Sequence, residues 1–227
     1  MKIAREGYPF AAAGLLLAGA LWTSVWLGVA TPDGLAGRAL VASAWLMSGI
    51  SVFVLWFFRD PAPDVPTDPD LVVAPGQGKI IVVDDVEEPT LFHGTARKIS
   101  IFLSVFDVHV QRAPVTGRVT RKVYKPGTYA VAWADKASDD NEQASLVIAT
   151  ERGPVLVRQI AGLIARRIVT DPVEGDVVER GRRFGLIRFG SRVDVFLPVH
   201  WDVLCSVGDR VRAGSTVIAR QRPEVTS

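Results

Sequence analysis

Two long runs near the start of the chain, residues 8–30 and residues 39–58, carry no charged side chain. At ~1.5 Å per residue, helices over these runs would be about 35 Å and about 30 Å long, enough for the ~30 Å hydrocarbon core of a bilayer. The short stretch between them contains charged residues, proline and glycine, which predicts a turn. The pattern therefore predicts a helical membrane hairpin over residues 1–59.

Basic residues flank this hairpin unevenly. Lys2 and Arg5 precede the first run and Arg59 follows the second, whereas the turn carries only Arg38. Cytoplasmic flanks of membrane helices are enriched in Lys and Arg, so we expect the protein in the cell (inner) membrane with its following domain on the cytoplasmic side. A signal peptide over the first run and two buried helices of a soluble core are alternatives. The second apolar run and the lack of a polar face on either run disfavour them.

The remainder of the chain has the pattern of a β protein. Residues 60–71 hold four prolines among several aspartates, which predicts a linker. From residue 72 to residue 227, short runs of β-branched and aromatic residues alternate with Gly, Pro and Asp. We expect strands in these runs and one helical turn within residues 161–169; the runs cover residues 79–86, 98–110, 117–125, 129–134, 144–150, 153–162 and 191–199. The predicted fold is an antiparallel β-sandwich or barrel-like domain.

An internal repeat supports this fold class. Residues 175–187 and 208–219 share the pattern Gly-Asp-x-Val-x-x-Gly followed by an apolar run. The repeat resembles the half-motifs of biotinyl- and lipoyl-type β-sandwiches, which present a lysine at a hairpin tip. No lysine follows Lys136, which argues against a swinging-arm carrier. In this register Ser215 is an ordinary turn residue that leads into a strand.

Composition narrows the function classes. The net charge of +2 gives no bulk attraction to nucleic acid, so no nucleic-acid partner is expected. The single cysteine, Cys205, excludes a disulfide framework, and its apolar surroundings predict a small buried residue rather than a reactive thiol.

Gly190 and Ser191 interrupt what would otherwise be one strand in "GLIRFGSRVDVFLP". Glycine permits a strained backbone at this point, from which a serine hydroxyl could attack the preceding carbonyl group. The alternative from the pattern alone is a β-bulge with a solvated serine.

Three stretches together, "GLIRFGSRVDVFLP", "KISIFLSVFDVHVQRAPVTGRV" and "EGYPF…LWFFRDP", resemble the short, archaeal-type form of phosphatidylserine decarboxylase. The resemblance implies self-cleavage between Gly190 and Ser191, which gives a large subunit (1–190) and a small subunit (191–227) that stay associated. It also implies that Ser191 becomes a covalent pyruvoyl cofactor, with no metal. That group would form a Schiff base with phosphatidylserine in the membrane, and the products would be phosphatidylethanolamine and CO₂.

The same resemblance assigns roles to other residues. His109 matches the first histidine of the family's Tyr-His-x-x-His-x-Pro stretch and is the expected acid or base, a role that suits a group titrating near neutrality. Arg192 and Phe106 are candidate substrate-binding residues. Gln77 and Arg112 depart from the family pattern, because they stand where larger bacterial forms have the Asp and second His that assist self-cleavage.

Those two departures keep a second function class open. In it, the chain is an unprocessed, non-catalytic, membrane-tethered β-sandwich that binds a lipid or a protein partner. Cleavage of the chain discriminates between the two hypotheses, since only the enzyme requires it. Association into a homo-oligomer is compatible with both.

Overall fold

The computed structural model describes the chain apart from residues 1, 32, 128–140, 163–166, 189–190 and 224–227. It divides into two compact units, residues 1–61 and residues 62–227. The strand expected at residues 129–134 and the carbonyl group of Gly190 lie outside the described residues. Residues 163–166, in the stretch where one helical turn was expected, also lie outside them.

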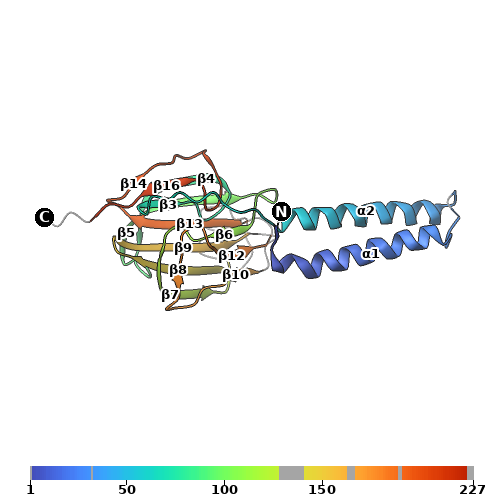
Figure 1. Cartoon of the computed structure of the whole chain (residues 1–227), viewed down its shortest axis with the longest axis horizontal. Helices are drawn as coiled ribbons and strands as arrows, with labels where there is room; N and C mark the ends of the chain where they lie inside the picture. Colours follow the sequence, from blue (N-terminus) through green and yellow to red (C-terminus); the bar gives the residue numbers. More distant parts are fainter. Residues whose placement is uncertain (1, 32, 128–140, 163–166, 189–190, 224–227) are drawn as a thin grey trace. The chain divides into compact units, whose positions relative to one another are not determined.

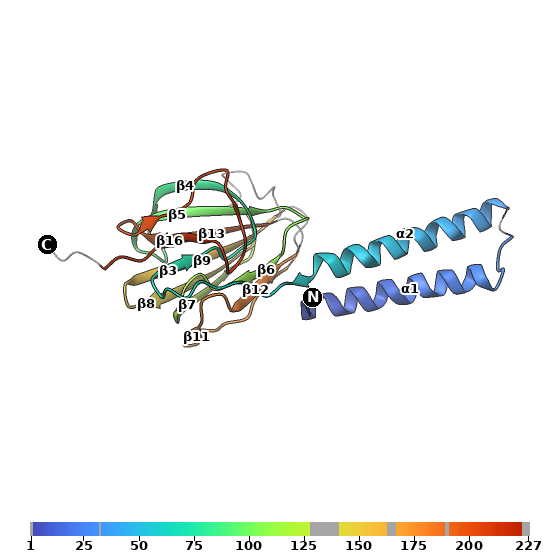
Figure 2. The same cartoon turned by 45° about the horizontal axis from the view of Figure 1, so that its top comes forward.

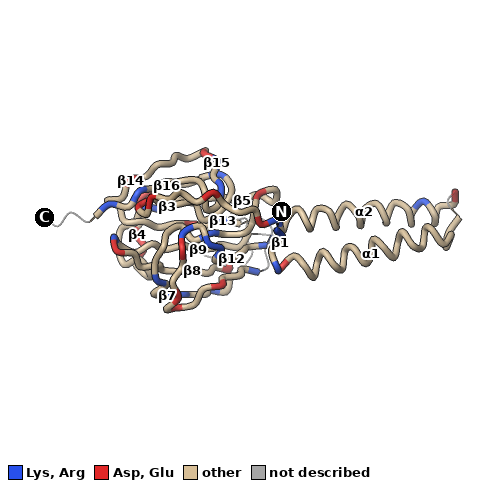
Figure 3. The backbone as a smooth tube through the Cα atoms, in the orientation of Figure 1, with Lys and Arg blue, Asp and Glu red and all other residues tan. Residues whose placement is uncertain are grey.

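The first unit is a helical hairpin. Its elements are β1 (Lys2–Ile3), the 3₁₀ turn η1 (Arg5–Gly7), α1 (Tyr8–Trp26), α2 (Leu35–Phe57) and β2 (Arg59–Asp60). Strands β1 and β2 pair antiparallel, with Lys2 opposite Asp60, so both ends of the hairpin lie together. Charged residues are confined to the ends of the helices (Figure 3). The predicted hairpin is confirmed, and both helices are long and apolar enough to cross a membrane.

Small residues line the contact between the two helices. Ala18 of α1 and Ala44 of α2 are buried, and a Cβ atom added to Gly14 would lie 2.6 Å from the Oγ of Ser51. Small residues at such positions let membrane helices approach closely. The large apolar side chains point outward instead, and Leu16 is 75% exposed. This unit therefore presents its apolar surface to its surroundings, as a membrane hairpin does.

The second unit is built of antiparallel strands, which confirms the predicted fold class (Figures 1 and 2). The strands are β3 (Leu71–Val73), β4 (Gly78–Glu88), β5 (Gly94–Leu103), β6 (Val110–Arg112), β7 (Gly117–Lys125), β8 (Gln143–Thr150), β9 (Gly153–Ala161), β10 (Ile168–Thr170), β11 (Val177–Val178), β12 (Arg183–Ile187), β13 (Ser191–Pro198), β14 (Asp202–Val203), β15 (Arg210–Val211) and β16 (Val217–Arg220). Within the described residues, one sheet has eight strands in the order β11-β7-β8-β9-β13-β5-β4-β15. Two three-stranded sheets, β10-β12-β6 and β14-β16-β3, accompany it.

The sequence repeat corresponds to the two edges of the large sheet. Strand β11 from the first copy pairs with β7, and strand β15 from the second copy pairs with β4. The second strand of each copy, β12 or β16, is the middle strand of a three-stranded sheet. Each copy thus supplies one edge strand and one central strand, so the two halves of the unit are built alike.

Alternation along β13 sorts its side chains onto two faces. Val193, Val195 and Leu197 belong to the main hydrophobic core, and Ser191 shares their face because strand side chains alternate with period two. Phe196 belongs instead to a smaller apolar cluster on the opposite face. We call the face of Ser191 the inner face and the face of Phe196 the outer face.

The outer face carries a buried ion pair between Arg158 and Glu88, with a guanidinium nitrogen 2.7 Å from the Oε1 of Glu88. The guanidinium group also lies 4.9 Å from the centre of the Phe196 ring. Burial by itself would raise the pKa of Glu88. Hydrogen bonds from the Thr90 hydroxyl, from two backbone N–H groups and from Arg158 outweigh this effect and lower that pKa to about 2.

Because the pKa of Glu88 is lowered on folding, its ionised form stabilises the fold. This stabilisation is present above the unfolded-state pKa of about 4.3 and is lost as the pH falls towards about 2. We expect Glu88→Gln to lower the free energy of unfolding at pH 7 by about 2–3 kcal/mol, and the difference from the unchanged protein to shrink at pH 3. Urea unfolding in detergent at pH 7 and at pH 3 measures the difference in free energy of unfolding between the two proteins. Glu87→Gln, at an exposed neighbour, should change stability by less than about 0.5 kcal/mol.

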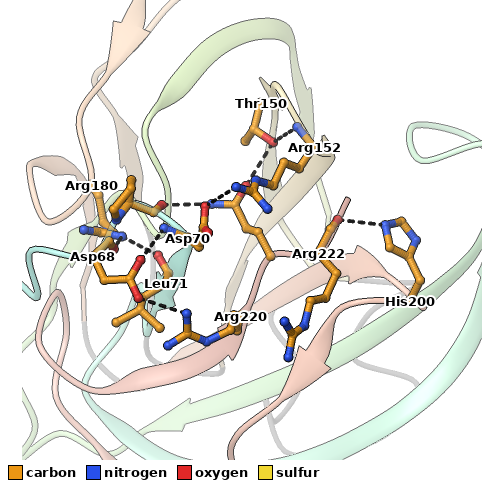
Figure 4. Close-up of polar contacts among 11 residues, drawn as sticks. Asp68, Asp70, Leu71, Thr150, Arg152, Arg180, His200, Arg220 and Arg222 are labelled. Atoms are coloured by element: carbon orange, nitrogen blue, oxygen red, sulfur yellow. Dashed lines mark hydrogen bonds and ion pairs between the residues drawn. The ribbon is translucent and has the colours of Figure 1, made fainter. Parts of the chain in front are cut away.

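The segment expected as a linker is bound along its length to the β unit (Figure 4). Arg180 donates hydrogen bonds to the backbone carbonyl groups of Pro66, Asp68 and Leu71 at 2.5–2.6 Å. Arg220 pairs with the Asp68 carboxylate at 2.9 Å, and Arg152 pairs with Asp70 at 2.8 Å. These arginines hold a proline-rich stretch that makes few backbone hydrogen bonds of its own.

Two glycines of the repeat make room for this segment. Gly181 and Gly214 have φ angles of +77° and +75°, a region that favours glycine. A Cβ atom on Gly181 would lie 2.3 Å from the side chain of Val65, and one on Gly214 would lie 2.9 Å from Pro63. The glycines therefore serve both the turn and the close approach of the segment.

Candidate active site

Ser191 is the first residue of β13, at one end of the large sheet. It lies opposite Leu103 of β5 and Ala161 of β9. Its side chain is fully buried, and its Oγ makes no hydrogen bond to any residue that the structure describes. A buried polar group without a partner costs about 1–3 kcal/mol, and such groups are rare in native proteins. The Ser191 hydroxyl is therefore a candidate reactive group.

The second Gly-Ser pair of the sequence has a structural role. The backbone N–H of Asp64 donates a hydrogen bond to the Oγ of Ser215 at 3.0 Å. Ser215 lies in the turn before β16, where the repeat predicts it. Its hydroxyl binds the proline-rich segment, so the two serines differ in environment although their local sequences look alike.

His109 is fully buried two residues after a tight turn. In this turn the Asp107 carboxylate accepts hydrogen bonds from the N–H and the hydroxyl of Ser104, at 2.9 and 2.7 Å. The Nδ1 of His109 lies 3.0 Å from the carbonyl oxygen of Asp107. A carbonyl oxygen only accepts, so Nδ1 carries the hydrogen and the lone pair of the neutral ring is on Nε2. Nε2 is therefore the atom that can exchange a proton.

Strand register brings His109 to the end of the unit where β13 begins. The Nε2 of Gln159 in β9 donates to the Oε1 of Gln111 in β6 at 2.6 Å, which joins the small sheet to the inner face of the large one. Strand β6 is antiparallel to β12, and β12 ends at Ile187, just before Ser191. Because β6 and β12 run in opposite directions, His109, which precedes β6, lies beside the end of β12 that leads to Ser191. Ser191 and His109, the two predicted catalytic residues, both lie there.

The two predicted substrate-binding residues have different environments. Arg192 is 2% exposed on the outer face, where its guanidinium group makes a two-point ion pair with Asp194 at 2.8 and 2.9 Å. It would have to leave Asp194 to bind a substrate. Phe106, in the turn after β5, is 67% exposed and therefore accessible to a lipid. Their roles in substrate binding stay predictions.

The two departures from the family pattern differ in position: Gln77 lies between Gly76 and Gly78, both of which lie against Leu103, the residue opposite Ser191. Gln77 occupies the bend between β3 and β4 and is half-buried. Arg112 ends β6 and lines an open cavity of about 610 Å³ with Asp171 and Arg183. Of the other histidines, His93 and His200 are exposed and contact backbone carbonyl groups of Pro89 and Arg222.

Two polar residues next to the site were not predicted from the sequence. Asn141 is fully buried, and its Nδ2 donates to the carbonyl oxygen of Ala161 at 2.7 Å. Glu142 is 5% exposed; its Oε1 accepts a hydrogen bond from the Tyr124 hydroxyl at 3.1 Å, whereas its Oε2 is buried and has no partner in the described part of the chain. The available signal was the run Asn-Glu-Gln directly before an apolar strand, where charged residues are unusual.

Candidate metal ligands and the single thiol of the chain were also located in the structure. No group of three or more His, Cys, Asp or Glu side chains that could hold a metal ion occurs among the residues that the structure describes. Cys205 is half-buried, and burial, with a smaller contribution from Asp209, raises the pKa of its thiol to about 11. The thiol is therefore protonated at neutral pH and unreactive.

Comparison with known proteins identifies the family. A sequence profile described as phosphatidylserine decarboxylase matches residues 50–219. The phosphatidylserine decarboxylase proenzyme of Symbiobacterium thermophilum is 48% identical over 96% of this chain and 95% of its own length. The proenzymes of the same name from Azorhizobium caulinodans and Xanthobacter autotrophicus are 46% and 45% identical; the matches cover 96% and 100% of this chain, and 89% and 94% of those proteins. These matches confirm the resemblance, and the chain belongs to the phosphatidylserine decarboxylase family of carboxy-lyases.

Proposed function

We propose that this protein decarboxylates phosphatidylserine to phosphatidylethanolamine and CO₂, after cutting itself between Gly190 and Ser191 and converting Ser191 into a pyruvoyl group. The relatives are named proenzymes of this activity, which supports a precursor that is processed. The observation that carries the proposal is the fully buried Ser191 hydroxyl without a hydrogen-bond partner, at the start of a central strand.

The processing chemistry uses only the chain's own atoms and water. The Oγ of Ser191 attacks the carbonyl carbon of Gly190, the peptide C–N bond breaks, and an ester with a free amine results. Loss of the Cα proton of residue 191 then breaks its Cβ–Oγ bond and leaves a carboxylate on Gly190. Hydrolysis of the dehydroalanine at residue 191 releases ammonia and leaves the pyruvoyl carbonyl group.

The surroundings of Ser191 fit such a group. The Oγ makes no hydrogen bond that its removal would break, and pairing of β13 with β5 and β9 holds residue 191 in place. A pyruvoyl carbonyl supplies an electron sink for the electron pair released by loss of CO₂. In this proposal, the Nε2 of His109 holds the proton that replaces CO₂ on the substrate carbon.

Intact mass and a denaturing gel of the purified chain test this function. The expected products are fragments 1–190 and 191–227, with the small fragment lighter by one ammonia than a fragment that begins with serine. A chain that stays at full length while it binds phosphatidylserine would instead support the non-catalytic, membrane-tethered alternative.

The hairpin is proposed to hold this chemistry at the cytoplasmic surface of the membrane. Lys2, Arg5 and Arg59 gather at its paired ends, whereas Arg38 alone lies near its turn. By the positive-inside rule this distribution supports a cytoplasmic position for both ends. Interfacial capture would then keep the site where the substrate's head group resides.

Deleting residues 1–58 tests the anchor. We expect the shortened protein to be largely soluble and still to be cut, because Ser191 and the strands that hold it all belong to the second unit. Activity on a dispersed short-chain substrate should persist, whereas activity on bilayers should fall. Flotation with vesicles at high salt measures membrane binding, and a denaturing gel measures cleavage. Flotation equal to that of the full chain would show that the hairpin is not the anchor.

A further inference from the structure

Glu142 lies in one lateral row of the large sheet with Ser191. Ala161 stands directly opposite Ser191 across β9 and β13. The next pair after Gln143 and Ile160 in the register of β8 and β9 sets Glu142 opposite Ala161, and the N–H of Ala161 donates to the carbonyl oxygen of Glu142 at 3.0 Å. Residues directly opposite one another on antiparallel strands project to the same face. The side chains of Glu142, Ala161 and Ser191 therefore all point to the inner face.

Only the small side chain of Ala161 separates Glu142 from Ser191 in this row. Two strand spacings put their Cα atoms roughly 9.6 Å apart. The long side chain of glutamate and the hydroxymethyl group of serine cover most of this span, and a methyl group between them obstructs little. One bridging water molecule closes the remaining gap.

The same two residues carry buried polar atoms without partners. Among the described residues, neither the Oγ of Ser191 nor the Oε2 of Glu142 has a hydrogen-bond partner, and both residues are at least 95% buried. The other oxygen of Glu142 accepts a hydrogen bond from the Tyr124 hydroxyl, which fixes the carboxylate in place. The row thus contains a hydroxyl group that can donate a hydrogen bond and a carboxylate oxygen that can accept one.

We infer that Glu142 is the proton acceptor for the Ser191 hydroxyl during self-cleavage. The inference rests on the proposed cleavage at Ser191 and names the base for it. Neither Gln77 nor Arg112 can act as that base, because an amide and a guanidinium group do not accept a proton near neutral pH. The Glu142 carboxylate, in the row of Ser191, supplies the proton acceptor that Gln77 and Arg112 cannot provide.

The step is balanced in protons. The Ser191 Oγ–H proton passes to the Oε2 of Glu142, directly or through one water, as Oγ bonds to the carbonyl carbon of Gly190. When the C–N bond of the tetrahedral intermediate breaks, the same proton passes to the departing amine of residue 191. Glu142 returns to its carboxylate form, and the ester is the product.

The test follows the time course of cleavage of the full chain, synthesised in a cell-free system with phospholipid vesicles. We expect Glu142→Gln to slow cleavage by about 10²–10⁴-fold, the usual effect of removing a positioned base. Glu142→Asp retains a carboxylate and should recover part of this rate. Glu151→Gln, at the opposite end of the same β8–β9 hairpin and exposed, should cleave at the unchanged rate.

Hydroxylamine, which cuts esters, shows whether the variant is blocked before or after the ester forms. If Glu142 acts in the formation of the ester, Glu142→Gln holds no ester and hydroxylamine releases no fragment beginning with serine. Release of that fragment would overturn the assignment, since it would place the block at the elimination. Cleavage of Glu142→Gln at the unchanged rate would also overturn the inference. Absence of cleavage in the unsubstituted chain would instead overturn the proposed function on which it rests.

Folding is checked separately from cleavage. In a Ser191→Ala background no chain is cut, so thermal unfolding of Ser191→Ala and of the double variant with Glu142→Gln compares folding alone. We expect the two to unfold within a few degrees of each other. If the double variant is unfolded at the assay temperature, and Glu142→Asp is folded yet no faster than Glu142→Gln, the role of Glu142 is structural and the inference fails.

Discussion

A Ser191→Ala chain is expected to stay at full length on a denaturing gel, with no fragment of residues 191–227 at any time. Alanine has no nucleophile to attack the Gly190 carbonyl, and the peptide bond is otherwise stable for far longer than an expression experiment. Decarboxylation should be absent as well, because no pyruvoyl group can form. The substitution removes only a buried hydroxyl that makes no hydrogen bond, so the fold should survive.

Ser215→Ala is the matched control for this experiment. It alters the other Gly-Ser pair of the chain, whose hydroxyl accepts the N–H of Asp64. We expect normal cleavage and a loss of stability of about 1 kcal/mol, the net contribution of one hydrogen bond. If Ser215→Ala stayed intact and Ser191→Ala were cleaved, the cleavage site would have to be assigned to Ser215.

His109→Ala is expected to be cut normally but to decarboxylate ~10²–10⁴-fold more slowly, the usual cost of losing a positioned acid. The reason is the hydrogen bond from Nδ1 to the Asp107 carbonyl, which leaves Nε2 as the proton-exchanging atom. Release of labelled CO₂ from phosphatidylserine by the purified, fully cleaved variant measures the effect.

His200→Ala serves as the control for His109, because this exposed ring contacts the carbonyl oxygen of Arg222 and the ring of its neighbour Trp201, and no catalytic role is proposed for it. Its turnover should equal that of the unchanged enzyme. If the processed His109→Ala enzyme turned over at a near-normal rate, His109 would have no part in the decarboxylation.

Periodicity predicted the two helices and most of the long strands. The uncharged run at residues 8–30 became α1, and the expected strand at residues 191–199 became β13 with a one-residue difference. The expected strand at residues 98–110 is instead divided, because the Asp107 carboxylate binds Ser104 and turns the chain after Leu103. A side chain that bonds to a nearby backbone group competes with strand pairing, and hydropathy does not register it.

The surroundings of the candidate site depend on which strands become neighbours. Glu142 and Ser191 are 49 positions apart in sequence and share a row only through the register of β8, β9 and β13. The binding of the proline-rich segment likewise depends on Arg180 and Arg220, which lie far from Asp68 in the chain. A sequence pattern describes local preference, so it predicted Ser191 from a broken strand but could not predict what surrounds it.

Strand β13, which begins at the proposed cut, lies in the middle of the large sheet, so the two fragments can fold only together. It pairs with β5 on one side and β9 on the other, and β15 and β16 pair with β4 and β3. A fragment 191–227 could therefore leave only by opening the middle of the large sheet. If the chain is cut as proposed, folding before the cut is a first-order event within one chain, whereas refolding after it is a second-order encounter whose rate depends on concentration. The mature protein would keep its structure yet lose the ability to regain it in dilute solution.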